Sequence, residues 1–165
     1  MSHKNAPWYV FLSHSSSTTD RVWADSIRRR LISDGFSVWD ASVETQPGEN
    51  WARQVGAHLA AAHAMVVLMS PDAAKSQWVS NDISYALTSQ RLADCVIPVF
   101  VKPTLSGPWI LDELESVRTA SNPSLAAEQV SGLLRRKLVG KAQLVAKLKR
   151  SPRGRTLAAK ARETR

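Results

Sequence analysis

Six apolar residues, from Ala64 to Met69, follow one another without a polar interruption. Unbroken apolar runs of this length are typical of parallel strands that are covered on both faces, whereas half-exposed strands alternate apolar and polar residues. A second run, from Cys95 to Val101, is interrupted only by Pro98. Because proline cannot donate a hydrogen bond to a neighbouring strand, Pro98 predicts an edge strand or a bulge. The two runs together predict a mostly parallel sheet buried between helices.

Four amphipathic helices are predicted around these runs. The first follows Ser17 and Asp20, which have the spacing of a capping box, and it closes before Gly35. The last begins at Asn122-Pro123 and is expected to end at Gly140. The second begins at residues 49–50 and the third spans residues 76–87. The predicted buried faces are Val22, Trp23, Ile27 and Leu31 in the first helix; Trp51, Val55, Leu59 and Ala62 in the second; Val79, Ile83, Ala86 and Leu87 in the third; and Val130, Leu133, Leu134 and Leu138 in the last.

Shorter strands are predicted at residues 8–12, 36–39 and, with a weaker pattern, 116–119. Polar loops are expected at residues 40–48, after Ser70, and at 102–109. Strands and helices then alternate about five times with short connections, which is typical of an α/β domain. Because crossovers between parallel strands are right-handed, few topologies remain. We expect a flavodoxin-like three-layer sandwich with a five-stranded parallel sheet in the order 2-1-3-4-5.

The net charge of +8 is concentrated at one end of the chain. Residues 1–140 carry 13 Lys/Arg and 13 Asp/Glu, whereas residues 141–165 carry nine Lys/Arg and one acidic residue. We therefore predict a domain at 1–140 and a basic tail at 141–165 that is partly helical or disordered. Such a tail suits nucleic acid, an anionic surface or an acidic partner protein. The alternative is a solvated terminus with no partner.

Several classes of protein do not fit the sequence. One cysteine, Cys95, excludes a disulfide framework, and no group of Cys and His has zinc spacing, so no metal and no cofactor are expected. No apolar run approaches the roughly 20 residues of a membrane-spanning helix. The N-terminus has no secretory pattern, so we expect a cytoplasmic protein.

Ligands of such sheets bind at the carboxyl ends of the strands, close to the point where strand order reverses. This rule brings together the hydroxyl-rich turn 13–19, Trp39-Asp40, Ser70 and the start of the third helix. On that helix Trp78 and Asp82 lie one turn apart on a stripe beside the buried face. An aromatic ring and a carboxylate in this arrangement form either a ligand site or an ordinary helix surface, and hydroxyl clusters are often only turns. The spacing leaves both interpretations open.

Three other families of similar architecture can be compared directly. A phosphoacceptor receiver domain needs acidic residues after the first strand and an aspartate after the third, where this chain has Ser13-His14 and Ser70. A flavodoxin phosphate loop would need glycine, which residues 13–19 lack. No P-loop or dinucleotide-binding glycine pattern occurs anywhere in the chain.

The chain resembles a TIR (Toll/interleukin-1 receptor) domain over roughly residues 8–140. The resemblance rests on six segments that occur in the family's order: Tyr9–His14, Gly35–Asp40, Pro47–Trp51, Met65–Pro71, Ser76–Ile83 and Val96–Val99. Pro98 fits this resemblance, because the family tolerates proline in its fourth strand. The resemblance implies a bacterial-type, stand-alone TIR protein without a sensor domain of its own.

Many TIR domains cleave or cyclise NAD+ at the nicotinamide–ribose bond, with NAD+ as a substrate. The resemblance implies Asp82 as the catalytic residue, but at this position those enzymes have glutamate. Aspartate sets the carboxylate back by about 1.5 Å, a misplacement that can cost about 10²-fold in rate. Substrate-binding residues are expected to be Trp78, Ser13, His14, Ser15, Trp39 and Asp40.

The resemblance also implies self-association with other TIR domains. A neighbouring molecule would complete the site with its BB loop, represented here by Val43, Glu44, Pro47, Gly48 and Glu49. The expected function is NAD+ cleavage after TIR–TIR assembly in an immune, for example antiphage, or stress signalling response, with a separate sensor or effector protein. The alternative is a catalytically weak or inactive TIR that acts as a homotypic interaction module. A nucleic-acid-associated protein that uses its tail is a third possibility.

Overall fold

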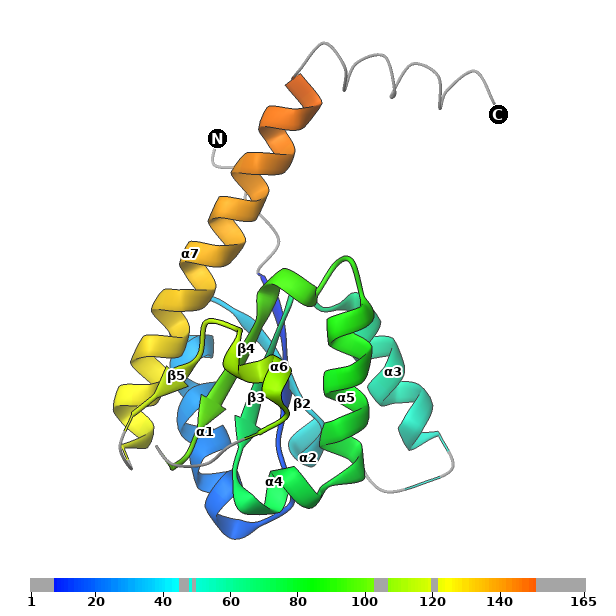
Figure 1. Ribbon diagram of the computed structural model, residues 1–165, viewed down its shortest axis with the longest axis vertical. Coiled ribbons are helices and arrows are strands. Elements are labelled where there is room, and N and C mark those ends of the chain that lie inside the picture. Colours follow the sequence, from blue (N-terminus) through cyan, green and yellow to red (C-terminus); the bar gives the residue numbers. More distant parts are fainter. Residues whose placement is uncertain (1–7, 45–47, 49, 103–106, 120–121, 151–165) are drawn as a thin grey trace.

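The computed structural model describes residues 8–44, 48, 50–102, 107–119 and 122–150. One parallel sheet has the strand order β2-β1-β3-β4-β5 (Figure 1). This order confirms the expected flavodoxin-like topology. The strands are β1 (Tyr9–Ser13), β2 (Ser37–Asp40), β3 (Ala64–Met69), β4 (Val96–Phe100) and β5 (Val117–Arg118).

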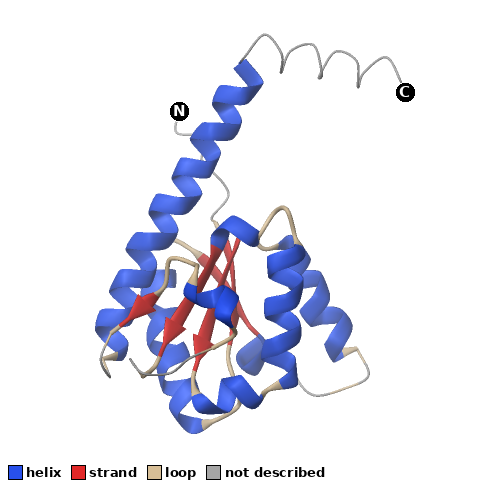
Figure 2. Ribbon diagram, viewed as in Figure 1, coloured by secondary structure: helices blue, strands red, loops and turns tan. Residues whose placement is uncertain are grey.

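Helices cover both faces of this sheet (Figure 2). The helices are α1 (Thr18–Ser33), α2 (Ala41–Glu44), α3 (Trp51–Ala61), α4 (Pro71–Lys75), α5 (Gln77–Thr88), the 3₁₀ turn η1 (Ala93–Cys95), α6 (Trp109–Asp112) and α7 (Pro123–Arg150). Successive strand side chains point to opposite faces. Val10 and Leu12 therefore join the core formed with α1 and α7, and Phe11 joins the core formed with α3, α5 and α6. The three layers follow from this alternation.

The central strands are buried as their sequences predict. All six residues of β3 are buried, which fits a strand covered by helices on both faces. Strand β4 is not at the edge of the sheet, so the expectation that Pro98 marks an edge strand is wrong. Pro98 lies opposite Val67 of β3, and the pairing of β4 with the two-residue strand β5 begins only at Val99. The proline thus precedes the short ladder that β5 forms.

The ends of α1 combine predicted and unpredicted contacts. Ser17 accepts a hydrogen bond from the backbone N–H of Asp20 at 3.2 Å, as a capping residue does. The Asp20 carboxylate, however, accepts hydrogen bonds from Ser15 and Ser70 and does not complete a capping box with Ser17. At the other end Gly35 has φ +91°, a left-handed conformation that favours glycine just after a helix.

The structure corrects four further expectations. Val22 is 58% exposed, and Ala24 is buried on α1 in its place. The segment 40–48 contains α2, and α4 follows Ser70, where loops were expected. Helix α7 continues through Gly140 to Arg150, so the expected end at Gly140 is wrong; in a helix, glycine costs only about 1 kcal/mol relative to alanine. Residues 151–165 of the predicted basic tail lie outside the described part of the chain.

Candidate functional site

Strand register brings the predicted site residues to one edge of the sheet. Leu12 of β1 pairs with Asp40, the last residue of β2, and Ser13 pairs with Val67 of β3. The residues after these strands therefore meet at the carboxyl edge, where parallel α/β sheets bind their ligands. A pocket of about 550 Å³ opens there. Its lining includes Ser13, His14, Asp40, Trp51, Trp78 and Asp82.

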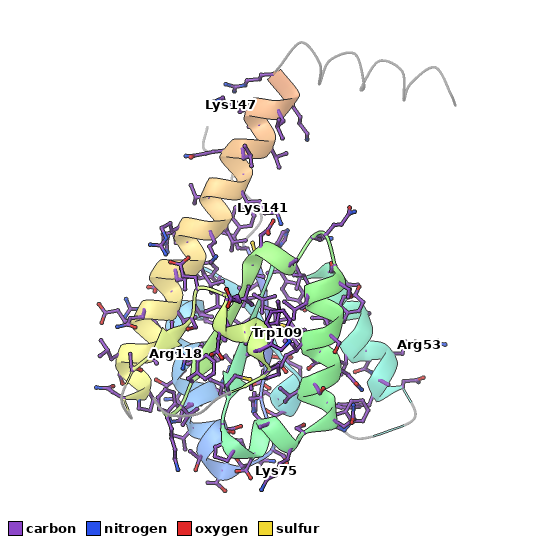
Figure 3. The ribbon with its side chains drawn as sticks, in the orientation of Figure 1. Arg53, Lys75, Trp109, Arg118, Lys141 and Lys147 are labelled. Carbon is purple, nitrogen blue, oxygen red and sulfur yellow. The ribbon has the colours of Figure 1, made fainter. Side chains whose placement is uncertain are left out.

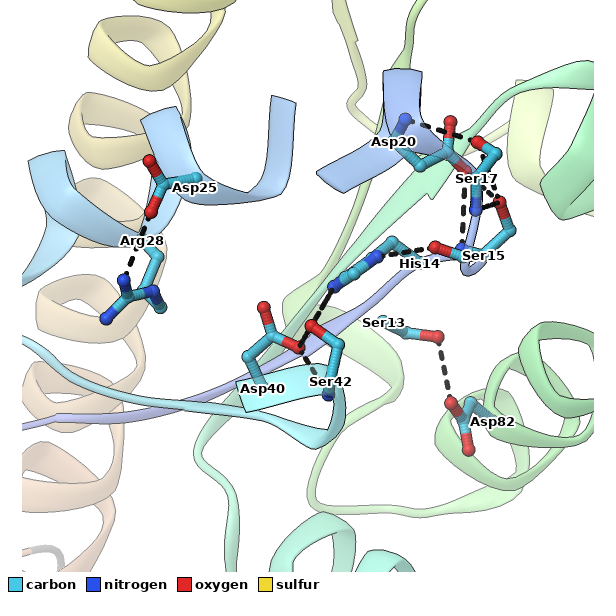
Figure 4. Close-up of polar contacts among 10 residues, drawn as sticks. All are labelled: Ser13, His14, Ser15, Ser17, Asp20, Asp25, Arg28, Asp40, Ser42 and Asp82. Atoms are coloured by element: carbon cyan, nitrogen blue, oxygen red, sulfur yellow. Dashed lines mark hydrogen bonds and ion pairs between the residues drawn. The ribbon is translucent and has the colours of Figure 1, made fainter. Parts of the chain in front are cut away.

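Helix α5 points the carboxyl group of Asp82 at the end of β1. The helix begins after Ser76, whose hydroxyl accepts a hydrogen bond from the backbone N–H of Val79. Because the face of α5 with Val79 and Ile83 is buried, the neighbouring face with Trp78 and Asp82 is directed toward the pocket. The Ser13 hydroxyl donates a hydrogen bond to Asp82 Oδ2 at 2.8 Å (Figure 4). Burial raises the pKa of Asp82 from 3.8 to about 6, and the hydrogen bond from Ser13 opposes that shift. Asp82 is thus a carboxyl group that changes charge close to neutral pH.

Two tryptophans form the aromatic wall of this pocket. Trp78 lies one turn before Asp82 on α5 and is 52% exposed. Its ring meets the ring of Trp51, the first residue of α3, at a centroid distance of 4.0 Å and an interplanar angle of 89°. Such edge-to-face pairs are favourable. Trp51 therefore holds the exposed ring of Trp78 beside the carboxylate.

His14 and Asp40 form a buried ion pair on the other side of the pocket. Nε2 of His14 lies 2.9 Å from Asp40 Oδ1, and Nδ1 lies 2.7 Å from the carbonyl oxygen of Ser15. Both neighbours are acceptors, so both ring nitrogens must carry hydrogen and His14 is an imidazolium ion. The Ser42 hydroxyl and backbone N–H also donate to Asp40 Oδ1, at 2.7 and 2.8 Å (Figure 4). The side chains of His14 and Asp40 are each only 3% exposed.

The pKa values of both partners shift toward the charged forms. Burial alone would lower the pKa of His14, but the hydrogen bond and negative charge of Asp40 outweigh it and raise that pKa. Burial alone would raise the pKa of Asp40, but the hydrogen bond and charge of His14, together with Ser42, lower it. The two charged side chains therefore balance each other within the wall of the pocket.

A second buried carboxylate, that of Asp20, supports the β1–α1 turn from behind. Its Oδ2 accepts hydrogen bonds from the Ser15 hydroxyl at 2.7 Å, the Ser70 hydroxyl at 2.8 Å and the Ser15 backbone N–H at 3.2 Å. Its Oδ1 is buried and has no hydrogen-bond partner among the described residues. Asp20 thus ties the turn after β1 to the end of β3 and fixes the position of Ser13 and His14.

Most of the predicted binding residues meet at the pocket, and one does not. Ser13, His14, Ser15, Asp40, Trp78 and Asp82 all line it. Trp39 does not, because it is 5% exposed and its ring stacks on His58 at 4.4 Å in the core beneath. The pleat explains the difference, since Trp39 and Asp40 point to opposite faces of β2.

The predicted BB-loop residues are only partly within the described chain. Val43 is 56% exposed on α2, and Glu44 and Gly48 are exposed as well. Pro47 and Glu49 lie outside the described residues. The described members of this set are thus accessible at the surface beside the pocket.

Arg21 and Trp51 line the pocket although the sequence analysis did not assign them to it. Trp51 fitted the buried stripe of its helix, and its place at the end of the segment Pro47–Trp51 was the signal for a second role. Arg21 lies in the first turns of α1 and forms no ion pair with any described carboxylate. Its position after a hydroxyl-rich turn was the signal that could have identified it.

Among the described residues, no cluster of His, Cys, Asp and Glu could hold a metal ion. None of the described helices combines the length and the apolarity needed to cross a membrane.

Comparison with known proteins places this fold in a family. The sequence model of the TIR domain matches residues 10–134. A similar solved structure is the TIR domain of the Toll-related receptor TRR-2 from Hydra magnipapillata, at 18% identity and a TM-score of 0.58, covering 81% of this chain and 97% of that one. The TIR domains of the activated Roq1 resistosome, which directly recognizes the pathogen effector XopQ, have 17% identity, a TM-score of 0.49 and coverage of 84% and 77%. No curated protein matches the chain. Because the family's sequence model matches most of this chain, the chain belongs to the TIR domain family.

Proposed function

We propose that this TIR domain cleaves NAD+ at the bond between nicotinamide and ribose, with ADP-ribose left in linear or cyclic form. One observation carries the proposal: the carboxyl group of Asp82 lies in a pocket at the carboxyl edge of the sheet, held by Ser13 and flanked by Trp78. The volume, about 550 Å³, is in the range of small-molecule sites. NAD+ is the substrate, and no other cofactor is needed.

The chemistry requires a negative charge more than a proton donor. When the bond from C1′ to the pyridinium nitrogen breaks, its electron pair moves onto the ring, which leaves as neutral nicotinamide. The ribose is left as an oxocarbenium-like cation, which a nearby carboxylate stabilises. Water then attacks C1′ and loses a proton, or an adenine nitrogen attacks in the cyclising reaction. Asp82 supplies the carboxylate in its ionised form.

The rest of the pocket offers complementary groups for the dinucleotide. Trp78 presents a half-exposed ring on which nicotinamide can stack, and Trp51 supports it edge-on. Arg21, which forms no ion pair with a described carboxylate, gives the lining positive charge that suits the diphosphate. Ser13 and Ser15 supply hydroxyl groups at the end of β1.

Assembly is part of the proposal. The exposed residues Val43, Glu44 and Gly48 would contact a neighbouring TIR domain, whose own loop would complete the pocket. Activity in the cytoplasm would then respond to a separate sensor or effector protein in immune or stress signalling. The family membership supports self-association, and the exposed apolar side chain of Val43 suits such a contact.

A second candidate function is a homotypic interaction module with little or no catalysis. It is favoured by the shorter carboxylate: Asp82 takes the place of glutamate, and its Oδ2 already accepts the Ser13 hydroxyl. In this case the exposed surface around Val43 would still drive assembly, while nicotinamide release would be negligible.

Nicotinamide release from NAD+, measured by chromatography with purified, crowded protein, separates the two candidates. The first predicts turnover that Asp82→Asn abolishes, because asparagine keeps the shape but cannot carry the charge. Asp72→Asn is the matched control, since Asp72 lies exposed on α4 outside the pocket. Turnover that survives Asp82→Asn would show that Asp82 is not the catalytic carboxylate.

The Asp82→Glu variant tests the length of the side chain. A gain of about 10²-fold in rate would show that the short side chain limits the wild type. Wild-type protein that self-associates but releases no nicotinamide, together with an active Asp82→Glu variant, would favour the interaction module.

A further inference from the structure

A second pocket, of about 390 Å³, lies at the opposite edge of the sheet. Trp8 and His63 directly precede β1 and β3, so they mark the amino ends of these strands. Arg91 follows α5, and the last turns of α7 form the outer wall with Lys141, Val145 and Lys149. Helix α7 extends well beyond the sheet at this edge (Figure 1). This pocket therefore depends on the part of α7 that follows Gly140.

Three basic side chains line this pocket, and no carboxylate lines it among the residues that the structure describes. Arg91 donates hydrogen bonds to the carbonyl oxygens of Ala60 and Ala61, and Lys141 donates to the carbonyl oxygen of Arg91 at 2.7 Å. These acceptors are neutral. Within the described chain, neither Arg91 nor Lys141 nor Lys149 forms an ion pair, and none of the lining residues is acidic. An anion would find three cations here.

His63 adds a neutral hydrogen-bond donor to the same pocket. Its Nδ1 accepts the backbone N–H of Tyr9 at 3.0 Å, so the hydrogen of the neutral ring is on Nε2. Burial and the charge of Arg91 both lower the pKa of His63, which keeps the ring neutral at physiological pH. The ring of Trp8 packs against His63 at a centroid distance of 5.4 Å and an angle of 82°.

The other lining groups are apolar. Leu138, Ala142, Val145 and Ala146 form the α7 side, and Trp8 is only partly buried. A tryptophan ring and aliphatic side chains favour a flat apolar group, while the cations favour a negative one. The three cations line a concave space, which suits a small molecule better than a polymer backbone.

We propose that this pocket binds a small anion that carries an aromatic ring, such as an aryl phosphate or a nucleotide. The ring lies against Trp8 and Val145, and the anionic group lies between Arg91, Lys141 and Lys149. The proposal does not depend on the chemistry at Asp82, because the two pockets share no residue.

1-Naphthyl phosphate is a suitable probe, and the indole N–H signals of the full chain report where it binds in an NMR titration. Trp8→Phe identifies the Trp8 signal. We expect this signal to shift saturably. In the Lys149→Glu variant the dissociation constant should rise about fivefold, as for loss of a partly exposed charge contact. Lys147 lies on the same helix (Figure 3) but does not line the pocket. Lys147→Glu is therefore the matched control: it makes the same charge change and should leave binding nearly unchanged.

Two comparison compounds make the test specific. 1-Naphthol lacks the charge and inorganic phosphate lacks the ring, so each should bind at least tenfold more weakly than naphthyl phosphate. Equal binding of 1-naphthol would overturn the anion site, and equal binding of phosphate would overturn the aromatic part. Saturable shifts confined to the Trp78 signal would also overturn the proposal. So would an equal loss of affinity for 1-naphthyl phosphate in the Lys147→Glu and Lys149→Glu variants.

Discussion

At the scale of single residues, ionisation of the Asp82 carboxyl group lowers the stability of the fold. Burial raises its pKa from 3.8 to about 6. Well below pH 3.8 it is protonated in both the folded and the unfolded chain and costs nothing. Well above pH 6 it is ionised in both, and the shift corresponds to a destabilisation of up to about 3 kcal/mol. A functional carboxylate in a pocket commonly lowers stability in this way.

Asp82→Asn is therefore expected to be nearly neutral for stability at pH 3 and to stabilise the fold at pH 8, by up to about 3 kcal/mol. Urea denaturation at the two pH values measures the difference. Asp72→Asn provides the control and should slightly destabilise at pH 8, because a carboxylate in the first turn of α4 favours the helix. A loss of stability in Asp82→Asn at pH 8 would contradict the assigned burial of charge.

The His14–Asp40 pair has the opposite dependence on pH. The folded-state pKa of His14 is raised, so its contribution is complete below pH 6.5 and disappears as pH rises through that higher value. The pKa of Asp40 is lowered, so its contribution disappears only in acid below 3.8. His14→Gln should therefore cost about 3 kcal/mol at pH 6 and clearly less at pH 9. An equal loss of unfolding free energy at both pH values would show that His14 is not an imidazolium ion in the fold.

At the scale of elements, Asp20 connects α1 to the ends of β1 and β3. Three hydrogen bonds converge on its Oδ2, from Ser15 and Ser70. Asp20→Ala leaves the Ser70 hydroxyl and the Ser15 backbone N–H buried without this acceptor, and should cost about 3 kcal/mol in urea denaturation. Asp25→Ala on the same helix removes only partly exposed ion pairs with Arg28 and Arg29 and should cost less than about 1 kcal/mol. Similar losses in the two variants would contradict the role of Asp20.

Glycines mark the predicted ends of two helices, but only one of these helices ends there. Helix α1 ends just before Gly35, whereas α7 continues through Gly140. Gly35 has φ +91°, which only glycine adopts readily, whereas a Cβ at Gly140 would meet no atom within 4 Å. Gly140→Ala is expected to raise helicity in circular dichroism and to stabilise α7 by about 1 kcal/mol. Gly35→Ala should destabilise by about the same amount because of its conformation. Destabilisation by Gly140→Ala would contradict a continuous α7.

At the scale of the whole molecule, the sequence predicts the sheet better than the site. Parallel strands buried on both faces have apolar runs such as Ala64–Met69, and such runs can be recognised without knowledge of their partners. The pocket depends on side chains from separate elements. Asp40 lines it and the adjacent Trp39 does not, and this difference depends on which face of β2 each residue occupies. The local sequence patterns of Arg21 and Trp51 do not assign either residue to the pocket, and only the packing of α1 and α3 brings them to it. The continuation of α7 was missed because local glycine signals do not report tertiary context.

The last prediction concerns assembly of the whole molecule. Val43 is an apolar side chain, 56% exposed, on the short helix beside the pocket. If a neighbouring TIR domain covers this surface, Val43→Glu places a charge in the contact, which costs at least about 1.4 kcal/mol, or tenfold in association. Nicotinamide release and sedimentation should both show this loss, while the melting temperature remains unchanged. Val139→Glu is the matched control, because Val139 is 41% exposed on α7, distant from the carboxyl edge. An equal effect of both variants, or activity independent of protein concentration in the wild type, would mean that a single domain is the active unit.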